Sequence, residues 1–368
     1  MKIGIDARMY GFKQTGIGLY IKNLIDGLID ADKENTFVVF LSEEGSREFS
    51  EKSSRVKKVI SPCMWYSFCE QIYFPFQIIK EGVDLMHFPH FNVPILYFGK
   101  FIVTIHDIIP LLYPGKKAGK SFFRRACFKF VFNKAIKRAK KIIAVSNSTK
   151  KDIIEKFEAD VKKISVVYEG IPLIAEGLSV PGFNLPPKPF ILYNGVWREH
   201  KNLSGLVKAF ASLVNKYKYD INLAIVGPYD EFYSEPKKIW QKEGLDKRVF
   251  VYEFLSDECL AEIYKNTLLA AVPSFYEGFG FVGLEAMSFG VPVVASDVAS
   301  LPEILGDAAL YFRPEDETEI AGCIKKIIDD PGLRIKMTEK GKNQAGKYSW
   351  KNMIEKTLII YKEVCGII

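Results

Sequence analysis

The stretch that most constrains the fold is residues 268–296, which combines two buried strands with one short helix. Leu268–Val272 and Val291–Ala295 are apolar runs of strand length, each next to Pro, Gly or Ser. Between them, Ser274–Gly280 is rich in turn residues, and Phe281–Phe289 predicts a short helix that a glycine ends. Strand, loop, helix and strand in this order form the unit of a parallel α/β sheet.

Two acids lie in this stretch, one on each side of the helix start. Glu277 is in the loop and Glu285 follows it eight residues later, so the two are roughly 12 Å apart if the stretch is mostly helical. The backbone amides at Gly280 and Phe281 predict an anion site between them. This order of groups would suit a sugar, a diphosphate and a ribose bound end to end. Taken singly, each acid could be a surface charge, but a helix this apolar is expected to be buried, where a glutamate needs a partner.

The motif Pro-Ser-x-x-Glu-Gly-Phe-Gly at 273–280, the spacing from Glu277 to Glu285, and Gly-x-Pro-Val-Val-Ala-Ser at 290–296 closely resemble glycosyltransferase family 4. Members of this family are retaining enzymes with the GT-B architecture. The resemblance implies an α/β chain of two Rossmann-like, doubly wound domains that face a central cleft. It also implies a C-terminal helix that crosses back to the first domain. The motifs are specific for the family but not for the sugar.

The length of the chain favours two domains, because one core for 368 residues would be unusually large. We expect an N-terminal acceptor domain over residues 1–180, completed by a crossing helix within 349–368. A C-terminal domain that binds the nucleotide-sugar donor is expected over residues 181–348. The boundary falls in residues 176–189, which hold four prolines and two glycines without a periodic pattern.

Composition and charge indicate a soluble globular protein with an anionic partner. Apolar residues make up 48% and charged residues 26% of the chain, and no run approaches the ~20 apolar residues of a membrane span. A strand that starts at Lys2 leaves no room for a signal peptide. The six cysteines lack Cys-x-x-Cys spacing, so we expect reduced, mostly buried thiols in a cytoplasmic protein. Residues 1–180 hold 28 Lys or Arg against 19 Asp or Glu, and residues 181–368 hold 23 against 25, so the anionic partner is expected at the first half.

The first half alternates short apolar or β-branched runs with helical patterns, which is typical of a parallel doubly wound sheet. After the first run, Gln14-Thr-Gly-Ile-Gly18 is expected to be a glycine turn. In family 4 the matching turn lies against the donor diphosphate, so the resemblance implies a donor-binding role for Gly16. Without the motifs of residues 268–296, a tight turn without a ligand would be the better explanation. The expected strands are Lys2–Ala7, Thr36–Leu41, Val56–Ile60, Asp84–Phe88, Phe101–Ile105, Ile142–Val145 and Ile164–Val167.

Three histidines are expected near the carboxyl ends of these strands, where ligands of such sheets bind. His106-Asp107 at a strand end resembles the family position whose imidazole contacts the transferred sugar, which favours a functional role for His106. Asp107 and His90 stay open between function and structure, and His87 is favoured as structural. No zinc site is predicted, because a third close ligand is missing. Asp30-Ala-Asp32 superficially resembles a metal-binding motif, but it follows an amphipathic helix, where a solvated loop is expected.

Residues 116–141 form a basic, Phe-rich stretch with eleven Lys or Arg, five Phe and no acid. Apolar residues at helical spacing in its second half predict a core helix with a solvated basic back. Phe122 and Phe123 lie off this stripe beside Arg124 and Arg125, and basic groups mixed with aromatics also suit an anionic membrane surface. Nucleic acid is a third hypothesis, which the absence of a nucleic-acid-binding motif disfavours.

A second strand-helix alternation starts at Phe190–Asn194 and continues through a polar loop, Gly195–Asn202, into a helix. Family 4 carries basic residues in this loop that neutralise the departing nucleotide diphosphate. Lys201, within Lys-Asn, matches one of them. Val196 stands where the family often has arginine, so Arg198 would have to substitute, and a solvated charge is an equal explanation for it.

The resemblance to family 4, together with these residues, implies transfer of a hexose, with mannose as the candidate, from a nucleotide-diphosphate sugar to a glycan or glycolipid in cell-surface polysaccharide synthesis. Glu285 would accept ribose hydroxyls, while Glu277 and His106 would orient the sugar. Lys201, together with Arg198, the Gly16 turn and the amides near Gly280, would stabilise the diphosphate without a metal ion or other cofactor.

Two alternatives remain at this point. One is a sugar-nucleotide epimerase on the same scaffold, and the other is a non-catalytic subunit that binds a nucleotide-sugar or a polyanion. The expected partners are the donor and a glycan or lipid-linked acceptor, with no nucleic acid. Attachment to the inner face of the membrane is a hypothesis that would place His90, Arg124 and Arg125 near the acceptor or the lipid.

Overall fold

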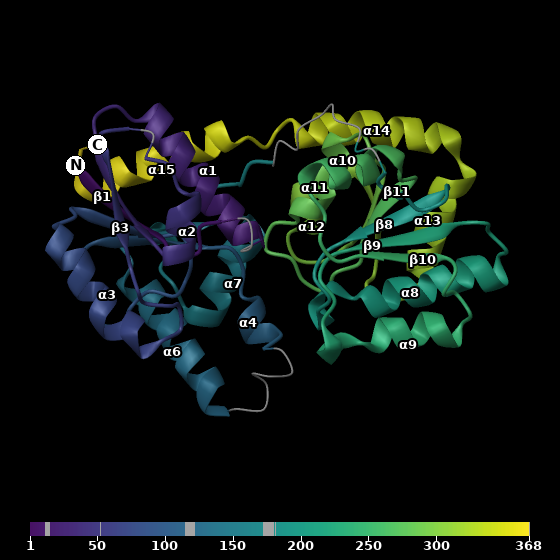
Figure 1. Ribbon diagram of the computed structural model, residues 1–368, viewed down its shortest axis with the longest axis horizontal. Helices are drawn as coiled ribbons and strands as arrows, with labels where there is room; N and C mark the ends of the chain where they lie inside the picture. Colours follow the sequence, from purple (N-terminus) through teal and green to yellow (C-terminus); the bar gives the residue numbers. More distant parts are fainter. Residues whose placement is uncertain (12–14, 52, 115–121, 172–179, 181, 368) are drawn as a thin grey trace. The chain divides into compact units, whose positions relative to one another are not determined.

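The computed structural model describes residues 1–11, 15–51, 53–114, 122–171, 180 and 182–367 (Figure 1). The chain divides into two compact units. The N-terminal unit comprises Met1–Leu111, Ala118–Gly170 and Ser349–Ile368, and the C-terminal unit comprises Leu112–Lys117 and Ile171–Tyr348. Each unit is a parallel sheet with helices on both faces.

The N-terminal unit is built on a seven-stranded sheet with the order β3-β2-β1-β4-β5-β6-β7. All neighbouring strands are parallel, so their carboxyl ends lie along one edge. The seven predicted runs all form strands, with ends shifted by at most one residue. The strands are β1 (Lys2–Ala7), β2 (Thr36–Leu41), β3 (Val56–Ile60), β4 (Leu85–Phe88), β5 (Phe101–Ile105), β6 (Lys141–Ala144) and β7 (Ile164–Val166).

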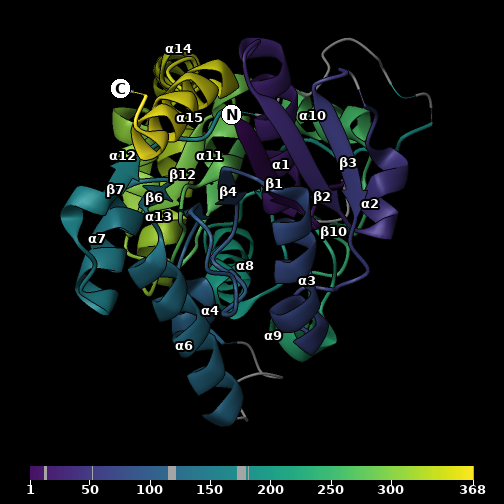
Figure 2. The ribbon, with the colours of Figure 1, turned by 90° about the vertical axis from the view of Figure 1, so that its left-hand side faces the viewer.

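Helices cover both faces of this sheet, because the crossovers on the two sides of β1 run in opposite directions. α1 and α15 lie on one face, and α3, α6 and α7 lie on the other (Figures 1 and 2). α1 and α15 approach closely at Gly27, where an added Cβ would come 2.5 Å from Ile354 Cγ1. The helices are α1 (Thr15–Ala31), α2 (Glu43–Glu48), α3 (Phe68–Glu81), α4 (Ile109–Leu112), α6 (Phe122–Arg138), α7 (Asn147–Phe157) and α15 (Trp350–Cys365).

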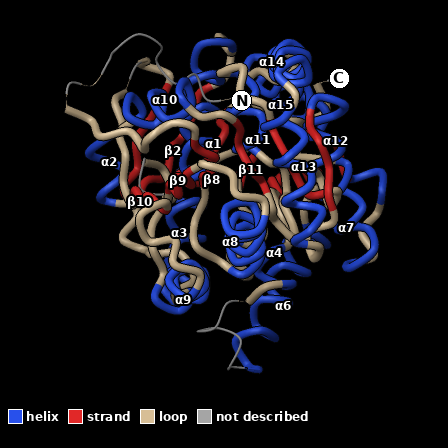
Figure 3. Tube along the Cα trace, turned by 90° about the vertical axis from the view of Figure 1, so that its right-hand side faces the viewer, coloured by secondary structure: helices blue, strands red, loops and turns tan. Residues whose placement is uncertain are grey.

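The C-terminal unit contains a six-stranded parallel sheet with the order β10-β9-β8-β11-β12-β13. The strands are β8 (Phe190–Asn194), β9 (Asn222–Val226), β10 (Val249–Tyr252), β11 (Leu269–Val272), β12 (Val293–Ser296) and β13 (Ala309–Phe312). The helices are α8 (Leu203–Ala211), α9 (Glu235–Lys242), α10 (Asp257–Asn266), α11 (Phe281–Ser288), α12 (Leu301–Leu305), α13 (Glu317–Asp329) and α14 (Pro331–Ala345). Helices α8 and α9 lie on one face, and α10, α11 and α14 lie on the other (Figure 3).

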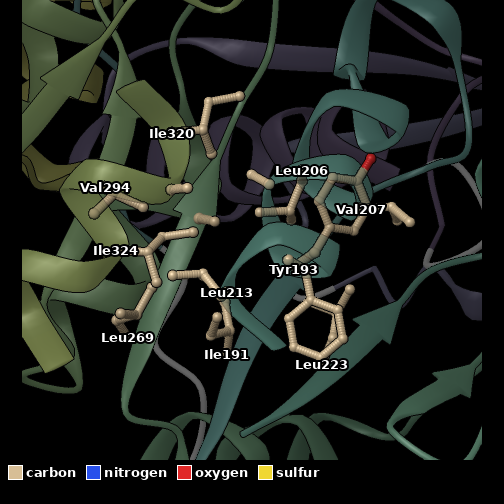
Figure 4. Packing of buried hydrophobic residues seen from close by; sticks show 14 of the residues in the cluster. Ile191, Tyr193, Leu206, Val207, Leu213, Leu223, Leu269, Val294, Ile320 and Ile324 are labelled. Carbon is tan, nitrogen blue, oxygen red and sulfur yellow. The ribbon is translucent and has the colours of Figure 1, made fainter. Parts of the chain in front are cut away.

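The core of this unit lies between the sheet and α8 and α13. Ile191 and Leu223 from the strands, Leu206 from α8 and Ile324 from α13 are fully buried and pack together (Figure 4). Burial of apolar side chains against both sheets stabilises the fold, at about 25 cal/mol for every Å² removed from water. The predicted α/β class with two doubly wound sheets is therefore confirmed, and so is the return of the C-terminal helix to the N-terminal unit.

Several local predictions were wrong. Thr15–Gly18 is already helical, so Gly16 lies in the first turn of α1 and not in a glycine turn; Gln14 lies outside the described residues. Asp32 is not solvated, because its buried carboxylate accepts hydrogen bonds from the amides of Glu34 (2.9 Å) and Asn35 (3.0 Å).

The cysteines also differ from expectation. Cys63 and Cys69, on the connection between β3 and α3, form a disulfide with their Cα atoms 5.2 Å apart. The chain turns back between them, which brings residues six positions apart to bridging distance. The other four are free thiols, and of these only Cys323 is buried.

No described helix has the length and apolar character needed to cross a bilayer.

Candidate functional site

The loops that follow β8 and β11 hold an ion pair between Lys201 and Glu277. The two strands are parallel neighbours, so both loops leave the same edge of the sheet. Lys201 Nζ donates a hydrogen bond to Glu277 Oε1 at 2.7 Å, and Ser274 Oγ donates to the same oxygen at 2.6 Å. The backbone joins the loops as well, since the amide of Phe275 donates to the carbonyl of His200 at 2.7 Å. The structure thus brings together two residues that the sequence analysis assigned to the sugar and the diphosphate.

The charges of this pair are set by burial and by proximity. Burial alone would raise the pKa of Glu277, but the Lys201 ammonium and the hydrogen bonds from Lys201 and Ser274 outweigh it and lower that pKa. Burial and the Lys201 charge lower the pKa of His200 to about 4. At neutral pH the site therefore holds a carboxylate, an ammonium group and a neutral imidazole.

Asn202 fixes the loop that carries Lys201. It has a left-handed backbone (φ 50°), and its Oδ1 accepts from the amide of Gly205 (3.2 Å) at the start of α8. Its Nδ2 donates to the carbonyls of Pro273 (3.0 Å) and Pro314 (2.7 Å). One side chain thus holds three segments in place, which makes Asn202 a positioning residue that the sequence analysis did not single out.

The start of α11 lies directly after the loop of Glu277. Gly280 precedes the helix with φ 95°, a conformation that favours glycine, and an added Cβ would come 2.8 Å from Leu301 Cδ2. Phe281 is the first helical residue, so the helix-start amides lie where the anion site is predicted.

Glu285 lies on α11 and has partners that the sequence analysis did not find. Tyr264 Oη donates to Glu285 Oε2 at 2.5 Å, and Asn194 Nδ2 lies 3.4 Å from the same oxygen. Asn194 Nδ2 also donates to Tyr264 Oη at 2.9 Å. Burial, with a contribution from Asp257, raises the pKa of Glu285 to about 7 against these hydrogen bonds. The two glutamates of the motif therefore differ in charge near neutral pH.

A sequence signal for part of this cluster exists. Asn194 is the last residue of β8, and a polar residue at the carboxyl end of a parallel strand is a candidate ligand-binding group. Tyr264, by contrast, lies among apolar positions of α10, where nothing marks it as a partner of Glu285.

Arg198 lies at a pocket of the C-terminal unit and not at the Lys201–Glu277 ion pair. Its side chain is exposed, and it borders a pocket of about 460 Å³ together with Trp197, Lys208 and Tyr233. Trp197 is buried, and its Nε1 lacks a hydrogen-bond partner among the described residues.

In the N-terminal unit, His106 follows β5 and both of its ring nitrogens are engaged. Nδ1 donates to Glu169 Oε1 at 2.7 Å and Nε2 donates to the carbonyl of Pro89 at 2.9 Å. Because a carboxylate and a carbonyl can only accept, both nitrogens carry hydrogen and the ring is an imidazolium. Burial would lower the pKa of His106, but Glu169 raises it above the ordinary value. For a ring nitrogen to contact a sugar, one of these two hydrogen bonds would have to be exchanged.

The other histidines of this unit have distinct surroundings. His87 is fully buried between Tyr361 Oη (2.7 Å) and Thr104 Oγ1 (2.9 Å), so it connects β4 to α15 and β5. His90 Nδ1 accepts from the amide of Asn92 at 3.4 Å. Burial, His106 and Arg8 lower the pKa of His90 to about 3, which keeps this ring neutral.

A buried charge network beside His90 was missed by the sequence analysis. Arg8, directly after β1, binds Asp6 with two hydrogen bonds (2.8 and 2.7 Å) and Glu70 with one (2.5 Å). Asn92 Nδ2 donates to the other oxygen of Glu70 at 2.6 Å. Buried charges require such partners, so this network orders the carboxyl ends of β1 and β4.

The remaining predicted site residues are less informative. Asp107 Oδ1 accepts from the amide of Ile109 at 2.8 Å, at the start of α4. Gly16 is exposed, and an added Cβ would meet nothing within 4 Å. Arg124 and Arg125 lie on α6, but their side chains are outside the described residues. Within the described part of the chain, no group of three His, Cys, Asp or Glu is arranged to hold a metal ion.

Two Rossmann-like units, each a doubly wound parallel sheet, give the chain the GT-B fold. Sucrose-phosphate synthase from Thermosynechococcus elongatus has the same fold, with a TM-score of 0.81 over 100% of both chains at 20% identity. The model of "Glycosyltransferase Family 4" matches residues 15–174, and that of "Glycosyl transferases group 1" matches residues 182–344.

The chain belongs to glycosyltransferase family 4. The O-antigen chain mannosyltransferase B of Escherichia coli is 32% identical over 292 residues, which cover 76% of this chain and 74% of the relative. The O-antigen chain mannosyltransferase RfbU of Salmonella typhimurium is 28% identical over 305 residues, which cover 82% of this chain and 79% of the relative.

Proposed function

We propose that this glycosyltransferase moves a hexose, with mannose as the candidate, from a nucleotide-diphosphate sugar to a glycan or glycolipid in the synthesis of a cell-surface polysaccharide. The observation that carries the proposal is the Lys201–Glu277 ion pair beside the start of α11, at the ligand-binding edge of the C-terminal sheet. The similarity to two O-antigen mannosyltransferases supports the choice of sugar and of polysaccharide synthesis.

The C-terminal unit would hold the donor, and residues 181–348 are proposed as the donor domain. The Lys201 ammonium and the amides at Gly280 and Phe281 would stabilise the charge that develops on the diphosphate. Arg198 would add a weaker, solvent-screened contribution. Because these groups supply positive charge, the reaction would not require a metal ion.

The two glutamates would bind different parts of the donor. Glu277, a carboxylate fixed by Lys201 and Ser274, would accept hydrogen bonds from hydroxyls of the sugar. Glu285, held by Tyr264 and Asn194, would accept from the ribose hydroxyls. The helix start between them would hold the diphosphate, which gives the donor an end-to-end orientation along α11.

Residues 1–180 and the helix in 349–368 are proposed as the acceptor domain. His106, as an imidazolium, would contribute positive charge and one exchangeable N–H toward the transferred sugar. Asp107 would contribute beside His106, His90 would lie toward the acceptor, and Gly16, in the first turn of α1, would approach the donor diphosphate. Transfer with retention would proceed by attack of the acceptor hydroxyl on the face from which the diphosphate leaves. A diphosphate oxygen would take the acceptor proton.

A donor panel tests the proposal. The protein would be incubated with GDP-mannose, UDP-glucose, UDP-N-acetylglucosamine and GDP-fucose, with and without lipid-linked glycan acceptors. Products would be read by mass spectrometry. We expect transfer of one hexose, with mannose preferred. Binding of sugar nucleotides without hydrolysis or transfer to any acceptor would contradict the proposal.

We further propose a cytoplasmic location with peripheral attachment to the inner face of the membrane. The basic excess of the first half supports it, and Arg124 and Arg125 within the basic stretch 116–141 are proposed to contribute.

A further inference from the structure

Helix α3 exposes an apolar face where a surface helix normally carries polar residues. Its inner face buries Phe74 and Ile78 against the sheet. Its outer face presents large apolar residues at positions i, i+4, i+8 and i+11, a single stripe of the helix. These residues are Phe68 (88% exposed), Ile72 (55%), Phe76 (65%) and Ile79 (63%).

The exposed apolar surface continues onto the loop after β4. Leu96 is 49% exposed and Phe98 is 78% exposed. This loop contacts α3, because the amide of Ile95 donates to Gln71 Oε1 at 2.8 Å. We call Phe68, Ile72, Phe76, Ile79, Leu96 and Phe98 the apolar face. Exposed apolar residues gathered in this way are typical of a protein or membrane interaction site.

Helix α6 borders the apolar face and supplies positive charge. Arg138 on α6 donates to the carbonyls of Ile95 (2.7 Å) and Tyr97, and its guanidinium lies 4.6 Å from the centre of the Phe98 ring. Earlier in this helix, Lys134 and Lys137 are exposed. We call these two lysines the basic flank.

The acids of the surrounding elements do not cancel this charge. From Leu85 to Lys163, a range that includes α6 and α7, the chain carries 17 Lys or Arg and five acids. Helix α3 contains two acids. Glu70 is fully buried against Arg8, and Glu81 is 12% exposed and pairs with Lys57 at 2.6 Å. The apolar face is therefore flanked by cations.

We propose that the apolar face enters the interfacial region of an anionic lipid bilayer, with the basic flank against the lipid phosphates. Apolar side chains next to exposed Lys and Arg match such a surface. The apolar groups are buried at the boundary of headgroups and acyl chains, and the cations are attracted to the anionic lipids. A second copy of this chain fits less well, because two copies would bring two basic flanks together. The inference rests on the proposed function, because a lipid-linked acceptor would be presented to the enzyme at the membrane surface.

Vesicle binding of the full chain tests the proposal without donor or acceptor. Vesicles of phosphatidylcholine with phosphatidylglycerol are compared with vesicles of phosphatidylcholine alone by cosedimentation. We expect the wild type to prefer the anionic vesicles. Ile72→Ser with Phe76→Ser should lower the partition coefficient by about tenfold or more, because apolar area is lost from the lipid. Lys134→Glu with Lys137→Glu should lower it mainly at low salt.

Matched controls lie on α15, which covers the opposite face of the same sheet. Ile359 is 49% exposed, and Ile359→Ser is the control for the apolar double variant. Lys351→Glu with Lys356→Glu, at two exposed lysines, is the control for the charge-reversal variant. These variants should bind vesicles like the wild type. Circular dichroism and thermal unfolding confirm that every variant is folded.

Insertion itself is read from fluorescence. The emission of Phe76→Trp should shift to the blue and be quenched by brominated lipid beyond the wild-type background, whereas Ile359→Trp should show neither change. Absence of quenching at position 76 would overturn the proposal even if the protein sediments with vesicles.

Two further results would also overturn it. One is equal vesicle binding by the wild type and the apolar double variant. The other is self-association of the wild type without lipid that Ile72→Ser with Phe76→Ser abolishes, which would assign the apolar face to a second copy. Hexose transfer to a water-soluble acceptor is measured in parallel. Intact transfer without lipid binding contradicts the docking surface alone, and lipid binding without any transfer contradicts the proposed function alone.

Discussion

Lys201 Nζ and Glu277 Oε1 lie 2.7 Å apart although 76 residues separate them in the sequence. The ammonium group holds the glutamate as a carboxylate, and the carboxylate holds the ammonium group beside the start of α11. Each group therefore fixes the position of the other before any ligand binds, and Lys201 also lowers the pKa of Glu277. Preorganised charges of this kind are effective in transition-state stabilisation, because they do not have to reorient during the reaction.

Replacing Lys201 by alanine should lower turnover by about 100-fold or more, since it removes the cation proposed to face the diphosphate. It should also raise the pKa of Glu277, whose lowering depends on Lys201. Steady-state kinetics with the preferred donor measure the effect. Lys340→Ala is the control, because Lys340 is an exposed lysine on α14 that pairs with Asp307. Near-normal turnover in Lys201→Ala would contradict its role, and Arg198→Ala should cost less than Lys201→Ala.

The two glutamates should affect donor binding differently. At pH 8, where the Glu285 carboxyl group is ionised, Glu285→Ala should weaken free nucleotide and nucleotide-sugar alike. The expected loss is about 1.5–3 kcal/mol, the usual worth of a hydrogen bond to a charged group. Glu277→Ala should leave the affinity for free nucleotide intact and depress turnover. Isothermal titration calorimetry with nucleotide and nucleotide-sugar distinguishes the two. Equal losses of nucleotide affinity would contradict the end-to-end orientation of the donor.

Glu285 should make stability depend on pH. Its pKa is raised to about 7 in the folded protein, against an ordinary value near 4.5. A carboxyl group with a raised pKa favours the folded state below the unfolded pKa, and this contribution is lost as pH rises through the folded pKa. Between pH 4.5 and 7 the loss should reach about 3 kcal/mol at most.

Glu285→Gln should remove this pH dependence. Chemical unfolding of wild type and variant at pH 5 and pH 8 measures it, and the variant should gain stability relative to the wild type at the higher pH. Glu262 of α10 pairs with Lys265, and the control Glu262→Gln should show no such change in the pH dependence of stability. A parallel pH profile for wild type and Glu285→Gln would rule out a raised pKa for Glu285.

Glu169 should determine the charge of His106. In the wild type, the pKa of His106 is raised by Glu169 against the effect of burial. Glu169→Gln removes the opposing charge and leaves the burial, so the pKa of His106 should fall relative to the wild type. NMR titration of ¹⁵N-labelled histidine measures this shift. Glu158 is an exposed acid at the end of α7, and the control Glu158→Gln should leave the pKa of His106 unchanged. An unchanged pKa of His106 in Glu169→Gln would contradict the role of Glu169.

Transfer should persist in excess chelator, because Lys201 and the helix-start amides supply the positive charge near the diphosphate. The measurement is hexose transfer before and after treatment with EDTA, followed by addition of Mg²⁺ or Mn²⁺. Loss of transfer on chelation and its return with the metal ion would contradict this mechanism.

The sequence alone determined the class of the fold, because parallel sheets leave a local signature. Strands buried on both faces are short apolar runs, so β1, β2, β5 and β8 were predicted at their observed bounds. The unit from β11 through α11 to β12 was predicted for the same reason, together with the family motif it carries. Helix ends and turns were less certain, as Gly16 in α1 shows, because one glycine is compatible with both a turn and a helix start.

The tertiary structure decided which polar groups meet. Glu285 with Tyr264, His106 with Glu169, and Arg8 with Glu70 are pairs separated by 21, 63 and 62 residues. No local pattern specifies such a partner, because sheet order and loop direction bring the two residues together. The same holds for α3: both of its faces are apolar in sequence, and only packing on the sheet determined that Phe74 is buried and Phe76 is exposed.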